Sequence, residues 1–281
     1  MKKISSLIII ALSLQLLSNS QTLRRPVAAG YPGLGAYSIA HVDVFSFMAN
    51  QASLARINNL SAGVYGEKRY MLNELSFYSL AFVVPTKSGN FGIKGSYYGF
   101  NLYNESQAGL AYARSLDSKI DIGVQFNYNT IKVAGYGNAY AISAEAGIIL
   151  HLSDKLHAGI HLNNPTGGKY NKSEDEKLPF VYTAGLGYEA SEKFFVSGEV
   201  QKEEDQPVNV NAGLQYKFLS QLIARAGLSS ASSTVWMGIG VSMKSFRIDA
   251  AASYHPHLGI TPGLMLVFNF RSTETKDEKT D

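Results

Sequence analysis

Residues 120–128 read Ile-Asp-Ile-Gly-Val-Gln-Phe-Asn-Tyr, and this stretch decides the fold because its apolar side chains recur at every second position. Successive side chains of a β-strand point to opposite faces of the sheet. The apolar residues therefore share one face, and Asp121, Gln125 and Asn127 share the other. Such a strand suits a barrel wall that meets lipid on one side and a polar lumen on the other.

The same two-sided pattern returns at residues 208–218 and 246–254. Short polar turns, such as residues 116–119 and 152–155, alternate with longer connections, such as residues 163–179. Bacterial outer-membrane barrels have short periplasmic turns on one rim and longer extracellular loops on the other. The pattern therefore indicates a chain of antiparallel hairpins with two different rims.

The fold class that we expect is all-β: a transmembrane antiparallel β-barrel of about fourteen strands, an even number that returns the chain to the periplasmic rim. A soluble sandwich or propeller is the alternative, because alternation does not identify the solvent on the apolar face. The expected strands are 60–68, 72–84, 90–100, 104–115, 119–133, 138–152, 155–163, 179–190, 193–203, 207–218, 221–229, 234–243, 245–255 and 259–270.

Residues 1–20 have the three parts of a secretory signal: Lys2 and Lys3, an apolar run, and small or polar residues before Gln21. An N-terminal membrane anchor is the alternative, but an apolar run of about fourteen residues is short for a helical span of about twenty. We expect a hatch segment at 21–57, the barrel at 58–270 and a charged tail at 271–281. The expected location is the bacterial outer membrane, with its lipid as a partner.

Composition excludes several classes of function. Removing Lys2 and Lys3 with the signal reduces the formal charge of +3, which leaves no basic field for nucleic acid. The sequence has no cysteine, so a thiolate metal site and a cysteine nucleophile are excluded. It also has no Gly-x-Ser-x-Gly motif. We therefore expect neither an enzyme nor a cofactor.

The segment before the barrel does not alternate. Its motif residues are Gly33, Gly35, Asp43, Asn50 and Ala52. This segment resembles the N-terminal hatch of FadL-like outer-membrane proteins, especially the PorV and PorQ branch. The resemblance rests on a glycine-rich stretch, an acidic position and the sequence Asn-Gln-Ala-Ser-Leu-Ala. Gln51 stands where that family usually has proline, and loss of a fixed φ is expected to loosen the turn.

The resemblance implies a barrel of about fourteen strands around an N-terminal plug. It further implies a component of type IX protein secretion or cell-surface assembly, as PorV and PorQ are in Bacteroidetes, with secretion subunits or secreted cargo as partners. The alternative is a FadL-like channel for small hydrophobic ligands. An apolar pocket under the hatch and a lateral gap would favour the channel, whereas a filled lumen would favour the secretion component.

Alternation assigns a set of polar residues of both charge signs to the lumen. They form either a mutually paired network or a path for a substrate. His157 and His161 are four apart on one strand, roughly 13 Å, which is too far to share one metal ion. The residues are Lys94, Asp121, Gln125, Glu145, His157, His161, Glu199, Arg225, Arg247 and Asp249.

The longest connection, residues 163–179, carries charges of both signs and is the candidate surface for a protein partner. Loops on a rigid scaffold are where binding residues collect. Its composition predicts a loop that buries no core of its own. The charged residues are Lys169, Lys172, Glu174, Asp175, Glu176 and Lys177.

Overall fold

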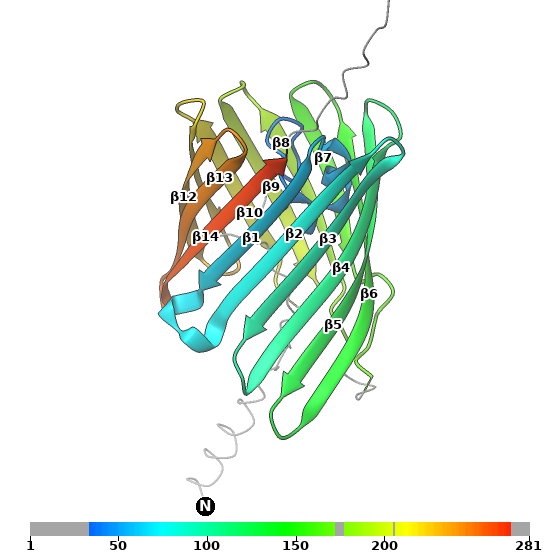
Figure 1. The fold of residues 1–281 in the computed structure, drawn as a ribbon, viewed down its shortest axis with the longest axis vertical. Helices are drawn as coiled ribbons and strands as arrows, with labels where there is room; N and C mark the ends of the chain where they lie inside the picture. The colour runs from blue at the N-terminus through cyan, green and yellow to red at the C-terminus, as the bar shows by residue number, and fades with distance from the viewer. Residues whose placement is uncertain (1–33, 172–176, 205, 271–281) are drawn as a thin grey trace, which may run out of the picture.

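The protein forms a closed barrel of fourteen antiparallel strands, which confirms the expected fold class (Figure 1). The computed structural model describes residues 34–171, 177–204 and 206–270. The expected signal (1–20), Gly33 and the expected tail (271–281) lie outside them. The strands are β1 Leu60–Lys68, β2 Ser76–Thr86, β3 Gly89–Gly99, β4 Tyr103–Ser115, β5 Ile120–Val133, β6 Gly137–His151, β7 Leu156–Asn163, β8 Val181–Glu189, β9 Phe194–Glu203, β10 Asn209–Lys217, β11 Leu222–Ser229, β12 Thr234–Met243, β13 Phe246–His255 and β14 Gly259–Phe270.

Pairing of β1 with β14 closes the barrel, in a register that aligns Leu60 with Phe270. The expected strand ends agree with the structure to within about two residues, the ordinary uncertainty of strand ends, except at β2. The chain does not enter β2 at residue 72, because residues 69–75 form two short 3-10 turns, η3 Arg69–Met71 and η4 Asn73–Leu75. Tyr70 and Met71 there have left-handed φ angles, which a continuing strand does not allow.

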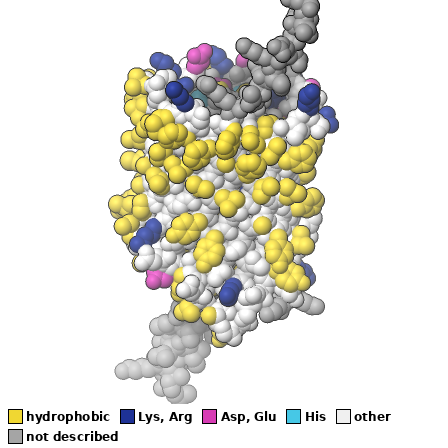
Figure 2. Space-filling model, in the orientation of Figure 1, with side chains coloured by type: hydrophobic (Ala, Val, Ile, Leu, Met, Phe, Trp, Pro, Cys, Tyr) yellow, Lys and Arg dark blue, Asp and Glu magenta, His cyan; other side chains and the backbone are white. Residues whose placement is uncertain are grey.

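Apolar side chains cover the outer wall, while charged side chains gather towards the two rims (Figure 2). Outward-facing aromatic residues lie near both ends of the strands, as in the girdles of transmembrane barrels. Near the short turns they are Phe91, Tyr112, Tyr188, Phe194, Tyr216, Phe246 and Phe268; near the longer loops they are Tyr78, Tyr97, Tyr128, Tyr140, Tyr182 and Tyr254. Among the described residues, no helix has the length and apolar character to cross a membrane.

The described part of the hatch, residues 34–57, lies inside the barrel near the rim of short turns (Figure 1). It carries two short 3-10 helices, η1 Ser46–Met48 and η2 Gln51–Arg56. Most of its side chains are buried against the wall. Among the described residues, the largest apolar cluster therefore lies between the hatch and the inner face of the barrel.

Candidate functional site

All of the polar residues assigned to the lumen lie on the inner face of the wall and are buried, apart from the half-buried Arg247. They do not form one continuous polar path. Many are joined in three networks, and each network is connected to the hatch. Hydrogen bonds and ion pairs within these networks offset the free-energy cost of burying the charged side chains.

The first network is centred on Glu145, whose side chain is 3% exposed. Its carboxylate lies among donors from the hatch and from β3, β5 and β7. The partners are Gln51 Nε2 at 2.6 Å, Asn127 Nδ2 at 2.7 Å, Gln125 Nε2 at 3.0 Å, His161 Nε2 at 3.0 Å and Lys94 Nζ at 3.3 Å. This carboxylate is thus held by charge-assisted hydrogen bonds, which are stronger than neutral ones.

Gln51 connects the hatch directly to this network. It is fully buried, and its amide donates to Glu145. Proline has no side-chain donor, so the substitution adds an anchor to the turn that we expected to be loosened. Asn50 caps η2 by accepting from the backbone N–H of Ala52 at 3.0 Å, and its side chain lies so close to Gly147 that a Cβ there would overlap it.

The second network joins both ends of the described hatch to the wall. Arg56 Nε donates to Asp121 Oδ2 at 2.6 Å, and that oxygen also lies 2.6 Å from His151 Nε2. His151 Nδ1 lies 2.9 Å from His157 Nδ1, and His157 Nε2 lies 3.4 Å from Glu189 Oε1.

Glu189 then accepts three hydrogen bonds from the other end of the hatch. Its Oε1 atom receives Ser38 Oγ at 2.7 Å, the Ile39 N–H at 2.8 Å and the Ala40 N–H at 3.1 Å. A single chain of contacts across β5, β6, β7 and β8 therefore links Arg56 to the segment 38–40.

The third network holds the middle of the hatch. Asp43 pairs with Arg247, which also donates to Asp249 Oδ2 at 2.6 Å; Asp249 in turn pairs with Arg225. Arg225 donates to Gln215, whose amide nitrogen lies 2.7 Å from His41 Nδ1. Burial lowers the pKa of His41 from its ordinary value, and Glu189 partly opposes this. A neutral His41 can accept through Nδ1, as this contact requires.

Tyr37 is a further hatch anchor that the sequence analysis missed. Its ring and backbone lie against Gly159, Gly185 and Gly187 on the inner wall, and its hydroxyl donates to Glu199 Oε2 at 3.2 Å. A signal was present, because the inward-facing positions of β7 and β8 are unusually rich in glycine, which allows another backbone to approach closely. The sequence analysis also missed Arg56, His151 and Glu189, since strand alternation does not show which inward-facing side chains contact the hatch.

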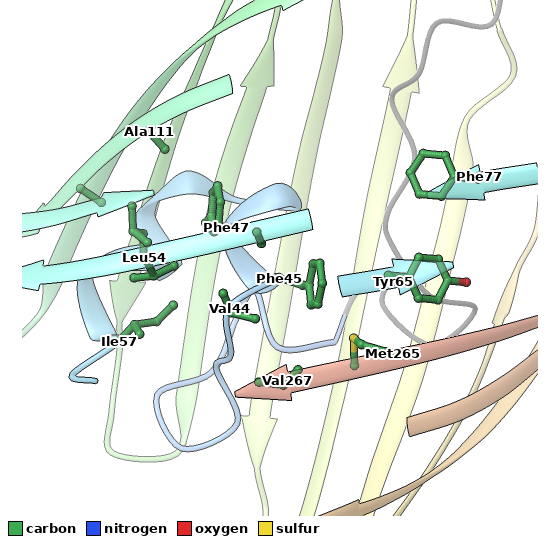
Figure 3. Packing of buried hydrophobic residues seen from close by; sticks show 13 residues of the cluster. Val44, Phe45, Phe47, Leu54, Ile57, Tyr65, Phe77, Ala111, Met265 and Val267 are labelled. Atoms are coloured by element: carbon green, nitrogen blue, oxygen red, sulfur yellow. The ribbon is translucent and has the colours of Figure 1, made fainter. Parts of the chain in front are cut away.

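An apolar region of the lumen lies beside the hatch, on β14, β1, β2 and β4. There the wall residues Tyr65, Phe77, Ala81, Val83, Ala111, Ala113, Met265 and Val267 pack with Val44, Phe45, Phe47, Leu54 and Ile57 of the hatch. Figure 3 shows Phe45 beside Tyr65 and Met265, and Leu54 and Phe47 towards Ala111. We call these wall residues the apolar sector.

The candidate partner loop is anchored at its described ends. Lys169 and Lys177 form an isolated antiparallel bridge, and Tyr170 and Leu178 are each only 5% exposed and pack with Ala141. The expectation that this loop buries no core is therefore wrong for its ends, because two apolar residues among the charges supply one. Lys172, Glu174, Asp175 and Glu176 lie outside the described residues.

Among the described residues, no cluster of three or more His, Asp or Glu side chains is arranged to hold a metal ion. His161 contacts Glu145 in the first network, whereas His157 contacts His151 and Glu189 in the second. The two histidines thus belong to different networks. Both networks fix the hatch in the lumen.

Comparison with solved structures identifies relatives of the fold. The chain is similar to the CymD monoaromatic hydrocarbon channel, with a TM-score of 0.64, 14% identity and coverage of 88% of this chain and 97% of that one. It is similar to the Pseudomonas putida toluene transporter TodX, with a TM-score of 0.62, 13% identity and coverage of 86% and 100%. A Pseudomonas aeruginosa FadL homologue gives a TM-score of 0.59, 12% identity and coverage of 85% and 96%.

No protein-family model matches the sequence, and no curated protein matches it. Because the identities are low, these likenesses show the fold alone: the chain has the barrel fold of FadL-like channels. The narrower resemblance to PorV and PorQ has no support in these comparisons.

Proposed function

We propose that this protein is a bacterial outer-membrane conduit for small hydrophobic molecules, and that the hatch closes the conduit near its periplasmic end. The observation that carries this proposal is the apolar sector, which lines one side of the lumen. The hydrocarbon channels with the same fold support it.

In this proposal, the apolar and the polar sides of the lumen have different roles. A pore for water and ions is lined with polar side chains all round, whereas here β14, β1, β2 and β4 present apolar side chains inwards beside the hatch. Tyr65 and Phe77 lie towards the extracellular loops, and Val83 and Val267 towards the short turns. Transfer of an apolar molecule onto such a surface is favoured by about 25 cal/mol for each Å² removed from water. The polar half of the lumen meanwhile anchors the hatch.

Uptake of radiolabelled toluene into proteoliposomes that contain the full chain tests this proposal. Phe77→Gln places a polar group in the apolar sector and should reduce uptake at least tenfold. Ser197→Gln makes a matched change on the polar side, where Ser197 is also buried, and should leave uptake within about twofold, since it leaves transfer to the apolar sector unchanged. Heat-modifiable gel mobility checks that both variants form barrels. Toluene uptake no faster than in protein-free vesicles, or equal uptake by the two variants, contradicts the proposal.

A second candidate, a PorV- or PorQ-like secretion component, is favoured by the filled lumen. The hatch occupies the periplasmic end, and the ladders β2–β3 and β3–β4 run in register from Phe77 to Thr86 and from Asn90 to Gly99. These strands of the wall therefore enclose the lumen without a break, and the hatch blocks the lumen at one end. Co-purification from native outer membrane, with mass spectrometry of the bound proteins, tests this candidate. Recovery of the barrel without stoichiometric partners would count against it.

A further inference from the structure

The turn η3, which lies between β1 and β2 at the rim of the longer loops (Figure 1), has a strained backbone. Tyr70 and Met71 have φ angles of 52° and 62°, in the left-handed region that residues with a side chain rarely adopt. Such strain persists only where surrounding contacts hold a segment in place. One of these contacts is the hydrogen bond from the Tyr70 backbone N–H to Thr261 Oγ1 of β14, at 3.0 Å. Further contacts come from Arg69.

Arg69, the first residue of this turn, places its guanidinium group against two aromatic rings of the lumen wall. Its Cζ atom is 5.5 Å from the ring centre of Phe77 and 5.1 Å from that of Tyr98. At these distances the face of an aromatic ring attracts a cation. Nε also donates to Glu67 Oε1 at 2.7 Å. The side chain of Arg69 is only 12% exposed, so these attractions act in a site largely shielded from water, where they are stronger.

The two rings under Arg69 belong to the outer end of the apolar cluster. Phe77 is a residue of the apolar sector, and Tyr98 packs against the same cluster. They are directly opposite each other on β2 and β3, so one guanidinium group covers both rings. A hydrophobic molecule that enters between the longer loops can therefore contact these rings only after Arg69 has left them.

The backbone strain and the contacts of Arg69 act in opposite directions. Release of the turn relieves the left-handed conformation of Tyr70 and Met71, but it also separates Arg69 from the rings and from Glu67. Met71 and Leu72 are 59% and 50% exposed, so their side chains add little to the closed form. The free-energy difference between the closed and the open turn is therefore smaller than the contribution of the contacts alone. A ligand that contacts the rings only in the open form shifts this equilibrium towards opening.

We propose that η3 is a lid over the outer end of the apolar sector, and that Arg69 controls the access of hydrophobic molecules to that surface. In the closed lid, the guanidinium group lies on Phe77 and Tyr98. In the open lid, the ligand takes its place on the two rings. The role of the ligand rests on the proposed conduit, whereas the lid itself rests on the contacts and the backbone of the turn.

A nitroxide label measures the lid without any ligand, because the sequence has no native cysteine. Leu72→Cys carries the label next to η3, and Leu102→Cys, which is exposed between β3 and β4, carries a control label. In lipid vesicles, Arg69→Ala should raise the mobile fraction of the Leu72→Cys spectrum about twofold or more, since it removes the attraction to both rings. Glu67→Gln with Arg69→Ala should do the same without leaving a buried carboxylate unpaired. Arg114→Ala, at an exposed position of β4, should change neither spectrum.

Two substitutions of Met71 test the backbone strain at an exposed side chain. Asn accepts the left-handed conformation more readily than most residues, whereas the β-branched Ile strongly disfavours it. Met71→Asn should therefore lower the mobile fraction of the Leu72→Cys spectrum and Met71→Ile should raise it, each by about twofold. A label that is as immobile in both Arg69 variants as in the wild type, or equally mobile in the two Met71 variants, overturns the lid.

Addition of toluene tests the control of access. It should raise the mobile fraction of the Leu72→Cys spectrum in the otherwise unchanged protein and add nothing in the Arg69→Ala background, where the lid is already open. Toluene that is taken up into proteoliposomes while the label stays immobile overturns the control by Arg69. Absence of uptake contradicts the proposed conduit instead, and the spectra recorded without ligand then decide the lid alone.

Discussion

The side-chain amide nitrogen of Gln51 lies 2.6 Å from Glu145 Oε2, so a hatch residue bonds directly to a buried carboxylate of the inner wall. Both side chains are buried. The barrel and the hatch are thus joined by a contact that the side-chain donor at position 51 supplies. The hatch is held here by side-chain chemistry in place of a rigid backbone.

Replacing Gln51 by leucine should loosen the hatch while the barrel stays folded. The change removes a hydrogen bond to a charged group, and the hatch should lose about 1–3 kcal/mol of stability. Trypsin cleavage after Arg56 in the folded protein measures this loss and should become about fivefold or more faster, by the usual conversion of free energy to population. Gln221→Leu, at an exposed position in the short turn between β10 and β11, is the control. Unchanged cleavage in Gln51→Leu would show that this bond contributes nothing to closure.

Gly187→Ala should prevent the hatch from taking its place. A Cβ at residue 187 would overlap the carbonyl of Tyr37, and a carbonyl cannot move without displacing the hatch backbone. Gly198→Ala, in the next strand, is the matched control, because its Cβ would meet nothing closer than 3.7 Å. Both variants should show normal heat-modifiable mobility, but only Gly187→Ala should give trypsin access to Arg56. Full protection of Arg56 in Gly187→Ala would contradict the close packing of Tyr37.

The fold could be predicted from the sequence because strand alternation and turn residues are local signals. Val124 and Gln125 lie on opposite faces of β5, as their alternation indicates. The one strand end that differed clearly was set by a non-local contact: the Tyr70 backbone N–H donates to Thr261 of β14 at 3.0 Å, across the closure of the barrel. A local pattern carries no information about such a partner.

The candidate site was harder to predict than the fold. Alternation placed Asp121 and His157 in the lumen, but it could not show that His151 lies between them. That contact depends on the register of three neighbouring strands and on where the hatch leaves space. The apolar sector was missed for the same reason: its residues are dispersed over the four strands β14, β1, β2 and β4, and only barrel closure brings β14 beside β1.

Arginine at Val124 should destabilise the barrel strongly. Val124 is 47% exposed on the outer face of β5, inside the apolar band, where arginine near the bilayer midplane costs about 2–4 kcal/mol. Leu152→Arg tests the same change in the short turn between β6 and β7, where the cost should be about 0–1 kcal/mol. Urea unfolding in lipid vesicles measures both. Equal losses would mean that residue 124 does not face the membrane interior.

The loop between β7 and β8 distinguishes the two proposed functions. Because Tyr170 and Leu178 pack against the wall, a deletion of residues 169–177 would disturb the barrel mouth as well as the charges. A cleaner variant replaces only residues 172–176 with a Gly-Ser linker and keeps the bridge between Lys169 and Lys177. A second variant, Tyr170→Ser, keeps the charges and removes a buried anchor, and the highly exposed Tyr136 provides the control substitution Tyr136→Ser.

If the loop receives a protein partner, the linker variant should lose partner capture in pull-downs from native membranes. Toluene uptake into vesicles should stay within about twofold of wild type, since the change leaves transfer to the apolar sector unaltered. Tyr170→Ser should increase cleavage of the loop by trypsin, because truncation of a buried aromatic costs about 3–5 kcal/mol. Tyr136→Ser should change neither measurement. Capture that persists in the linker variant removes residues 172–176 from any partner surface and favours the proposed conduit, in which the lumen and its apolar sector carry the function.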